Sequence, residues 1–271
     1  MNDTERMGAQ LNKPAPLDPQ SLRRMRITAG IDPESSGIEY GPLHRTIMPR
    51  SVCKTVRYVD YKSRDELAAH YMNDPNVDVS LIPEIDIVTG GALISDFVPD
   101  DSLDFVIASH VLEHVPDFIG WLETNLRLLR PGGRIALAFP DRRFCFDMAK
   151  QPTSFHEVIA AYFEKRTQPN FTQICDHILN SRKVTPAEIW DGRLNVDNAP
   201  SVHGSTGALS ILRKLVTKTG YHDVHCWKFS DQEFIDMLTR IKAELHLPFE
   251  VLSLFPTRRN TTEFFAVLVK V

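Results

Sequence analysis

Hydrophobic and polar positions between residues 103 and 140 alternate in a way that predicts a strand, a helix and a second strand. Residues 103–108 form a short apolar run bounded by polar residues, typical of a strand buried on both faces. After residues 116–117, which suit a helix start, apolar side chains recur at helical spacing: Phe118, Ile119, Leu122, Leu126 and Leu129. Residues 131–133 (Pro-Gly-Gly) end the helix, and residues 135–139 are again apolar. The pattern predicts a β-α-β unit.

Similar but shorter patterns precede this unit. Apolar runs predict three earlier strands, at residues 37–41, at 55–59 with Asp60 at its end, and at 85–88. Two helices are predicted at residues 21–29 and 63–71, the second with Ser63 and Glu66 at capping-box spacing. Because strands and helices alternate, we expect a doubly wound parallel sheet.

The alternation of predicted strands and helices ends after Pro140. Residues 141–229 contain three predicted helices, at 154–165, 171–181 and 208–219, and are interpreted as an insertion. Ser230 and Glu233 stand at capping-box spacing before a further amphipathic helix. Two final strands, at residues 249–255 and 264–269, are expected to pair antiparallel. The predicted fold class is α/β: a Rossmann-like, doubly wound, mostly parallel seven-stranded sheet with an antiparallel C-terminal hairpin and a helical insertion after the fifth strand.

Length and composition indicate one soluble domain. The 271 residues are 42% hydrophobic, and their formal charge of −4 with scattered Lys and Arg predicts no nucleic-acid partner. Four separated cysteines without a CxxC motif indicate neither a zinc ribbon nor a disulfide framework, so we expect a cytoplasmic protein. No apolar run approaches the ~18 residues of a membrane span. We predict a flexible tail at residues 1–17 and one domain at 18–271, in which 141–229 caps the acceptor side.

The order of elements resembles that of class I S-adenosylmethionine-dependent methyltransferases. The similarity rests on IEYG at residues 38–41, VD at 59–60, and the block from LDFVIASHVLEHVPD through LRPGGRIALAFP. The segments QICDHIL, DVHCW and TTEFFAVL also resemble a bacterial methyltransferase group associated with glycan assembly. The resemblance implies S-adenosylmethionine as the methyl donor.

The first two strands supply candidate donor contacts. A carboxylate at the end of the second strand can accept hydrogen bonds from both ribose hydroxyls, and Asp60 follows Gly41 at about the twenty-residue spacing of nucleotide folds. The resemblance implies that Glu39 organises the turn below the methionine amine, while Gly41 lets the backbone approach the ligand. Pro42 departs from the usual glycine-rich turn and has no N–H. Arg45 either pairs with the methionine carboxylate or is a surface residue.

The next two strands complete the predicted donor site. Ala92 and Leu93 belong to the TGGAL loop after the third strand, where the family places adenine contacts, although a plain glycine loop is the alternative. Tyr61 is likewise assigned to the donor site. Ser109 and His110 end the fourth strand, at the edge where open α/β sheets bind ligands, and are expected near the sulfonium.

The segment from His110 to His114 also matches HxxEH, a zinc-peptidase spacing in which one helical face presents both histidines. Here the motif crosses from a strand end to a helix start, so we do not expect one helix to present both imidazoles. We predict no metal ligands, and the involvement of a divalent ion is left open.

Transfer to a hydroxyl benefits from a general base, and histidine is the natural choice. We favour His177, beside Asp176 in a predicted helix of the insertion, with His225 next and His203 as a further candidate. Asp141, at the end of the fifth strand, could orient the base or hold a divalent ion.

The hypothesis is a methyltransferase acting on an oxygen of a small-molecule or oligosaccharide acceptor, most simply a sugar in a glycan pathway. Two alternatives stay open: a non-catalytic donor-binding or regulatory protein, motivated by the altered turn at residues 41–43, and a methyltransferase of small natural products. The sequence leaves homo-oligomerisation open.

Overall fold

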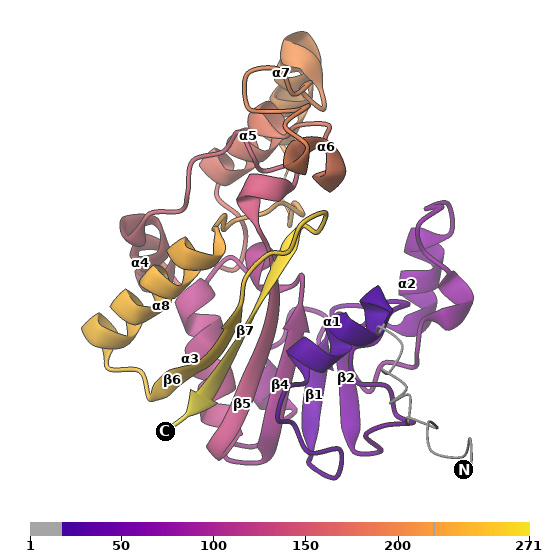
Figure 1. Ribbon diagram of the computed structural model, residues 1–271, viewed down its shortest axis with the longest axis vertical. Coiled ribbons are helices and arrows are strands. Elements are labelled where there is room, and N and C mark those ends of the chain that lie inside the picture. The colour runs from indigo at the N-terminus through magenta and orange to yellow at the C-terminus, as the bar shows by residue number, and fades with distance from the viewer. Residues whose placement is uncertain (1–17, 219) are drawn as a thin grey trace, which may run out of the picture.

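A single seven-stranded sheet organises the computed structural model, which describes residues 18–218 and 220–271 (Figure 1). The strand order is β3-β2-β1-β4-β5-β7-β6. Five strands run parallel: β1 (Gly37–Tyr40), β2 (Val56–Asp60), β3 (Ile87–Val88), β4 (Leu103–Ser109) and β5 (Leu129–Pro140). At the other end of the sheet, β7 (Glu263–Lys270) runs antiparallel to both of its neighbours, β5 and β6 (Phe249–Phe255). The predicted fold class is confirmed, while the predicted tail at residues 1–17 lies outside the described residues.

Helices around this sheet begin where the sequence supplies a cap. They are α1 (Pro19–Ile27), α2 (Arg64–Tyr71), α3 (Phe118–Leu128) and α8 (Asp231–Leu245), with short 3₁₀ turns η1 (Val79–Leu81), η2 (Ile94–Asp96), η3 (Leu112–His114) and η4 (Arg142–Phe144). Both predicted capping boxes, at Ser63 and Ser230, are present. Asp117 caps α3 by accepting the N–H of Gly120 at 2.8 Å.

The β1–β2 connection differs from the predicted alternation, because the structure gives residues 41–55 no α-helix. Pro42 and Pro49 remove backbone donors there, and Gly41 and Leu43 have left-handed φ values of 57° and 42°. The helix that covers this face is instead α1, which precedes β1 in the chain and packs near β5 and β7. The general alternation of strands and helices therefore does not extend to this connection, for which no helix was predicted.

The fifth strand also begins earlier than predicted. Leu129 pairs with Leu103, and the register then shifts so that Arg134 pairs with Phe105. The residues between them, including Gly132 with φ 81°, form an irregularity inside β5 rather than a turn before it.

Two hydrophobic layers enclose the sheet. One face packs against α3 and α8 through buried aromatic rings, such as Phe139 and Phe234 with centroids 5.2 Å apart. The other face packs against α1, whose Ile27 joins Phe105, Ile107 and Phe265. Burial on both faces explains why the central strands are almost wholly apolar.

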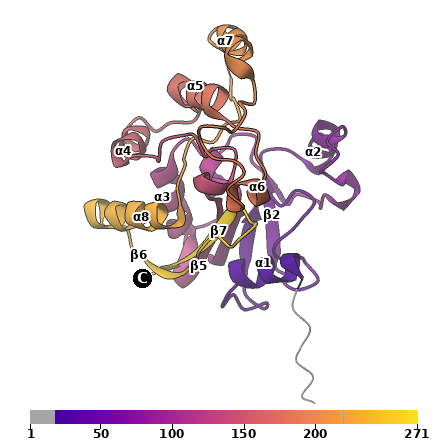
Figure 2. The same cartoon turned by 45° about the horizontal axis from the view of Figure 1, so that its top comes forward.

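The inserted residues form α4 (Phe155–Phe163), α5 (Phe171–Asn180), α6 (Pro186–Trp190) and α7 (Gly204–Leu215). Three of these helices match predictions, and the last residue of the predicted helix 208–219, Thr219, lies outside the described residues. The sequence did not predict α6, whose Trp190 stacks on Phe144 at 4.0 Å. Figures 1 and 2 show α5, α6 and α7 above the carboxyl-terminal edge of the parallel strands, while α4 packs beside α3. In the described ranges no helix is long and apolar enough to cross a membrane.

Candidate active site

Strand register brings the predicted donor residues to one edge of the sheet. Tyr40, the last residue of β1, pairs with Val59 in β2 and Ala108 in β4. The residues that follow on the three strands therefore meet at this edge: Gly41, Asp60 and Ser109. This is the edge at which open α/β sheets bind ligands.

Glu39 fixes the loop that follows β1. Its buried carboxylate accepts the backbone N–H groups of Ile47 at 2.7 Å and Met48 at 2.9 Å. Burial raises the pKa of Glu39 to about 7, although these two hydrogen bonds oppose the rise. A Cβ atom on Gly41 would lie 3.1 Å from Cγ2 of Val111, so glycine is favoured here by both space and φ. The loop is thus held by Glu39 rather than by a helix.

Asp60 ends β2 half-buried, and its Oδ1 accepts the backbone N–H of Lys62 at 3.2 Å. Burial raises the pKa of this carboxyl, and the backbone hydrogen bond partly offsets the rise. Tyr61 is 63% exposed and Leu93 is 67% exposed. These two side chains and the exposed Ala92 offer an apolar surface beside Asp60. Arg45 is exposed and forms no ion pair with the described residues, so its role stays a prediction.

Ser109 and His110 are tied to other elements of the chain. The hydroxyl of Ser109 accepts a hydrogen bond from Arg23 of α1. His110 has a left-handed φ of 54°, and its Nε2 lies 2.9 Å from Glu263, which also pairs with Arg23. Desolvation lowers the pKa of His110, but the neighbouring carboxylates of Glu113, at 3.4 Å, and Glu263, at 2.9 Å, outweigh it and raise the pKa to about 9. His110 is therefore held as an imidazolium at neutral pH.

A cavity of about 280 Å³ opens beside the end of β4 and is lined by His110, Glu113, His114, Phe146, His225 and Thr262, among others. The HxxEH segment does cross from the end of β4 into η3, as predicted. Folding nevertheless adds His225 to it: Glu113, His114 and His225 present ligand atoms within 4.8 Å of one another. No pattern in the sequence predicts this contact, because His225 is distant in the chain.

The candidate bases differ in their surroundings. His225 faces this cavity, and its Nδ1 lies 2.6 Å from the buried carboxylate of Asp147. The favoured His177 does not line the cavity; burial and the nearby Lys150 lower its pKa to about 4. Asp141 is fully buried and accepts hydrogen bonds from Arg143 and from Thr257 at 2.7 Å, which fits a structural role. His225, the second choice from the sequence, is therefore better placed than His177 to act as the general base.

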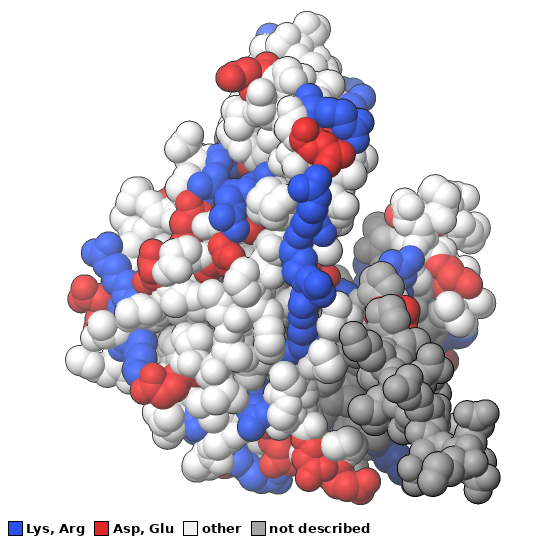
Figure 3. Space-filling view, viewed as in Figure 1, with Lys and Arg blue, Asp and Glu red and all other residues white. Residues whose placement is uncertain are grey.

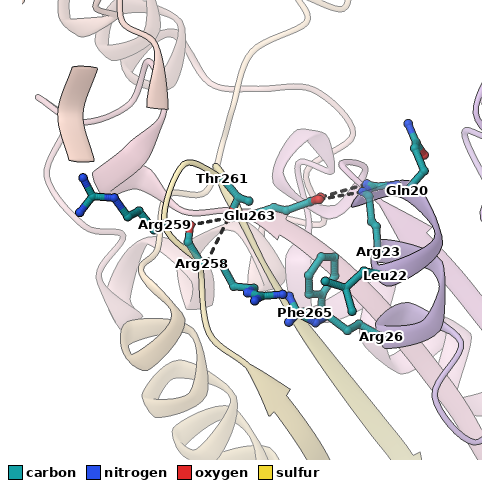
Figure 4. Close-up of a pocket in the computed structure, with 9 residues that line it drawn as sticks. All are labelled: Gln20, Leu22, Arg23, Arg26, Arg258, Arg259, Thr261, Glu263 and Phe265. Carbon is teal, nitrogen blue, oxygen red and sulfur yellow. Dashed lines mark hydrogen bonds and ion pairs between the residues drawn. The ribbon is translucent and has the colours of Figure 1, made fainter. Parts of the chain in front are cut away.

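An arginine-lined pocket of about 430 Å³ lies between α1 and the β6–β7 connection (Figure 4). Arg23, Arg26, Arg258 and Arg259 border it, and Figure 4 shows Arg26 and Arg258 converging beside Phe265. Figure 3 shows Lys and Arg side chains in a continuous column over this part of the molecule. The interpretation of these charges as scattered was wrong, because folding gathers arginines from both ends of the chain.

Comparisons with known proteins agree with the fold. A family model described as "Methyltransferase domain" matches residues 22–181. Demethylmenaquinone methyltransferase of Lysinibacillus sphaericus (strain C3-41) is 26% identical over 92 residues, which are 34% of this chain and 36% of that protein. The chain thus spans about a third of the length of this curated relative.

Two solved structures are similar to this chain at low sequence identity. A Rhodobacter sphaeroides chain named for zinc-dependent alcohol dehydrogenases is 13% identical, with 94% of this chain and 91% of that chain covered and a TM-score of 0.50. An S-adenosylmethionine-dependent methyltransferase from Mesorhizobium loti is 13% identical, with 93% and 98% covered and a TM-score of 0.47. The family model spans more than half of the sequence, and the chain therefore belongs to the methyltransferase-domain family, whose methyl donor is S-adenosylmethionine.

Proposed function

We propose that this protein transfers the methyl group of S-adenosylmethionine to a hydroxyl oxygen of an acidic or phosphorylated sugar, as found in glycan precursors. The observation that carries the proposal is the cavity beside the end of β4, in which the His225–Asp147 pair stands next to the predicted donor edge. Family membership supports the donor, and the geometry of this cavity supports the hydroxyl acceptor.

On the donor side, the residues at the carboxyl ends of β1 and β2 fit the ligand. Bound S-adenosylmethionine supplies an electrophilic methyl group on a sulfonium. Asp60 is suited to accept hydrogen bonds from the ribose hydroxyls, because its carboxylate stands half-buried at the strand end. Gly41 allows the backbone to approach the amino-acid part of the ligand, and Glu39 holds the loop that would surround that part.

On the acceptor side, methyl transfer requires alignment of an oxygen with the sulfonium and removal of the hydroxyl proton. Asp147 holds the Nδ1 side of His225, which orients the ring and leaves Nε2 for chemistry in the cavity. His225 therefore takes the role for which the sequence had favoured His177. The low pKa of His177, about 4, makes that residue a weak base at neutral pH.

The arginine-lined pocket supports an anionic acceptor. Burial and the charge of Arg258 lower the pKa of Arg26, so an anion between the two guanidinium groups would relieve their repulsion. Thr261 borders this pocket and the next residue, Thr262, borders the cavity of His225. The pocket and the cavity therefore share the segment that precedes β7. The proposal places a phosphate or carboxylate of the sugar in the pocket and the reacting hydroxyl in the cavity.

The test incubates the protein with S-adenosylmethionine and a panel of sugar phosphates, nucleotide sugars and uronic acids, with neutral sugars and catechols as comparison. S-adenosylhomocysteine is quantified, and products are analysed by mass spectrometry for a methyl ether. We expect turnover with an acidic sugar, loss of turnover in His225→Gln, and retention in His156→Gln, which alters an exposed histidine of α4. Arg258→Ala should raise KM for the acidic acceptor more than it lowers kcat.

Two results would contradict the proposal. Methylation of nitrogen or carbon, or equal turnover of neutral acceptors, would exclude the acceptor class. Absence of a thermal shift with both S-adenosylmethionine and S-adenosylhomocysteine would favour the non-catalytic alternative, because a ligand at a hundred times its Kd stabilises a protein by about 2.7 kcal/mol.

A further inference from the structure

The Glu113 carboxylate is a buried charge without hydrogen bonds. Its side chain is fully buried, and neither oxygen has a hydrogen-bond partner among the described residues. Its nearest charged neighbours are imidazole nitrogens, Nδ1 of His110 at 3.4 Å and Nε2 of His114 at 3.9 Å. A carboxylate in such a place is normally satisfied by hydrogen bonds, by a paired charge or by a metal ion.

Two histidines beside Glu113 each have a carboxylate partner on one ring nitrogen, as metal-binding histidines usually have. Nδ1 of His114 lies 2.7 Å from the carboxylate of Asp223, and Nδ1 of His225 lies 2.6 Å from that of Asp147. A carboxylate on one ring nitrogen fixes the tautomer and leaves the other nitrogen as the ligand, which is the usual arrangement around protein-bound metals. The rings of His114 and His225 are perpendicular, with centroids 4.7 Å apart.

We propose that Glu113, His114 and His225 bind one divalent transition-metal ion of the zinc type. Their ligand atoms lie within 4.8 Å of one another, so small side-chain shifts would bring all three within the bond length of about 2.1 Å that zinc requires. Two imidazoles and one carboxylate suit zinc or iron(II) rather than magnesium, which prefers an all-oxygen shell. All three residues line the 280 Å³ cavity, so the remaining coordination positions face the space assigned to the acceptor.

This site deepens the proposed function and rests on it for its role. The metal would bind the acceptor hydroxyl as a Lewis acid, and the hydroxyl would lose its proton to water. The O–CH₃ bond then forms as the S–CH₃ bond breaks, and the electron pair of the broken bond stays on sulfur. With the metal bound, His225 is a ligand that positions the ion, and the base role that the proposed function gives to this residue passes to water.

An ion-pair cluster without metal is the competing interpretation. In such a cluster the imidazolium of His110 would pair with Glu113 at 3.4 Å, yet neither oxygen of Glu113 accepts a hydrogen bond from the described residues. The carboxylates of Asp223 and Asp147 also hold Nδ1 of His114 and of His225, and Nε2 of His114 lies 3.9 Å from Glu113, an arrangement typical of metal ligands.

The test measures metal binding without donor or acceptor, so that it is independent of methyl transfer. The full-length protein is stripped with a chelator, and Co²⁺ is titrated while its visible absorption is recorded; bound zinc is counted by mass spectrometry after gel filtration. We expect one ion per chain with the spectrum of a four- or five-coordinate site. Glu113→Gln and His225→Gln should abolish that spectrum, and His156→Gln should retain it.

Asp223→Asn provides a variant whose folding is not at risk, since the side chain of Asp223 is 72% exposed. Loss of a carboxylate behind a metal-bound histidine should weaken binding by about 10- to 100-fold. Absence of bound ion in the wild-type protein, or unchanged affinity in Glu113→Gln, would overturn the inference. Metal binding without methyl transfer would contradict the proposed function and support the metal site. Methyl transfer by protein that binds no metal would support the proposed function and contradict the metal site.

Discussion

Replacement of Asp60 by alanine tests the donor site most sharply, because this carboxylate has one proposed task and a half-buried position at the end of β2. Two charge-assisted hydrogen bonds to the ribose hydroxyls would be lost. Each is worth about 1.5–3 kcal/mol, and solvent access favours the lower end, so the total loss is about 3 kcal/mol. Since 1.4 kcal/mol corresponds to tenfold in affinity, Asp60→Ala should weaken binding by roughly 100-fold.

The assay is calorimetric titration with S-adenosylhomocysteine at neutral pH, with circular dichroism to verify the fold. Asp65→Ala is the matched control, because the side chain of Asp65 on α2 is 95% exposed and should leave affinity unchanged. Burial raises the pKa of Asp60 above the ordinary value of 3.8. As the pH falls, wild-type affinity should therefore begin to decline at a higher pH than it would with an ordinary aspartate. Unchanged affinity in folded Asp60→Ala would refute the ribose assignment.

Three further perturbations test other parts of the account. Gly41→Ala should lower Tm and donor affinity, because a left-handed φ of 57° costs a non-glycine residue about 1–2 kcal/mol; equal melting curves would contradict this. His177→Ala should change kcat by less than about tenfold, whereas loss of a general base costs ~100-fold or more, and such a loss would return the role to His177. Burial raises the pKa of Glu233, but hydrogen bonds from Arg142 and Ser230 outweigh it and lower the pKa to about 2 from 4.5. The stabilisation is complete above pH 4.5 and is lost as pH falls through 2, so urea unfolding should show Glu233→Gln less stable by about 2 kcal/mol at pH 7. A deficit that persists near pH 2 would show that the effect is not electrostatic.

The sheet was predictable because its signals are local. The apolar runs of β4 and β5 and the capping residues Ser63 and Ser230 act within a few residues of the elements they specify. No helix was predicted between β1 and β2, and the structure has none there, although regular alternation would place one. Its absence depends on two prolines and on α1 occupying the face that such a helix would cover.

The acceptor side was predictable only in part, because its contacts join distant residues. Asp147 and His225 are 78 residues apart, and His114 and Asp223 are 109 apart. Single-sequence periodicity carries no information about such pairs, so the HxxEH segment was judged without the histidine that completes it. The choice between His177 and His225 likewise depends on burial and on Lys150, which only the folded chain reveals.

A structure of the protein with bound S-adenosylhomocysteine would show whether the donor edge and the metal-lined cavity form one active site. The account predicts the ribose hydroxyls on Asp60, the amino-acid part over Gly41, and the sulfur facing the cavity lined by Glu113, His114 and His225. A product molecule whose sulfur faces away from this cavity, or whose ribose makes no contact with Asp60, would contradict it.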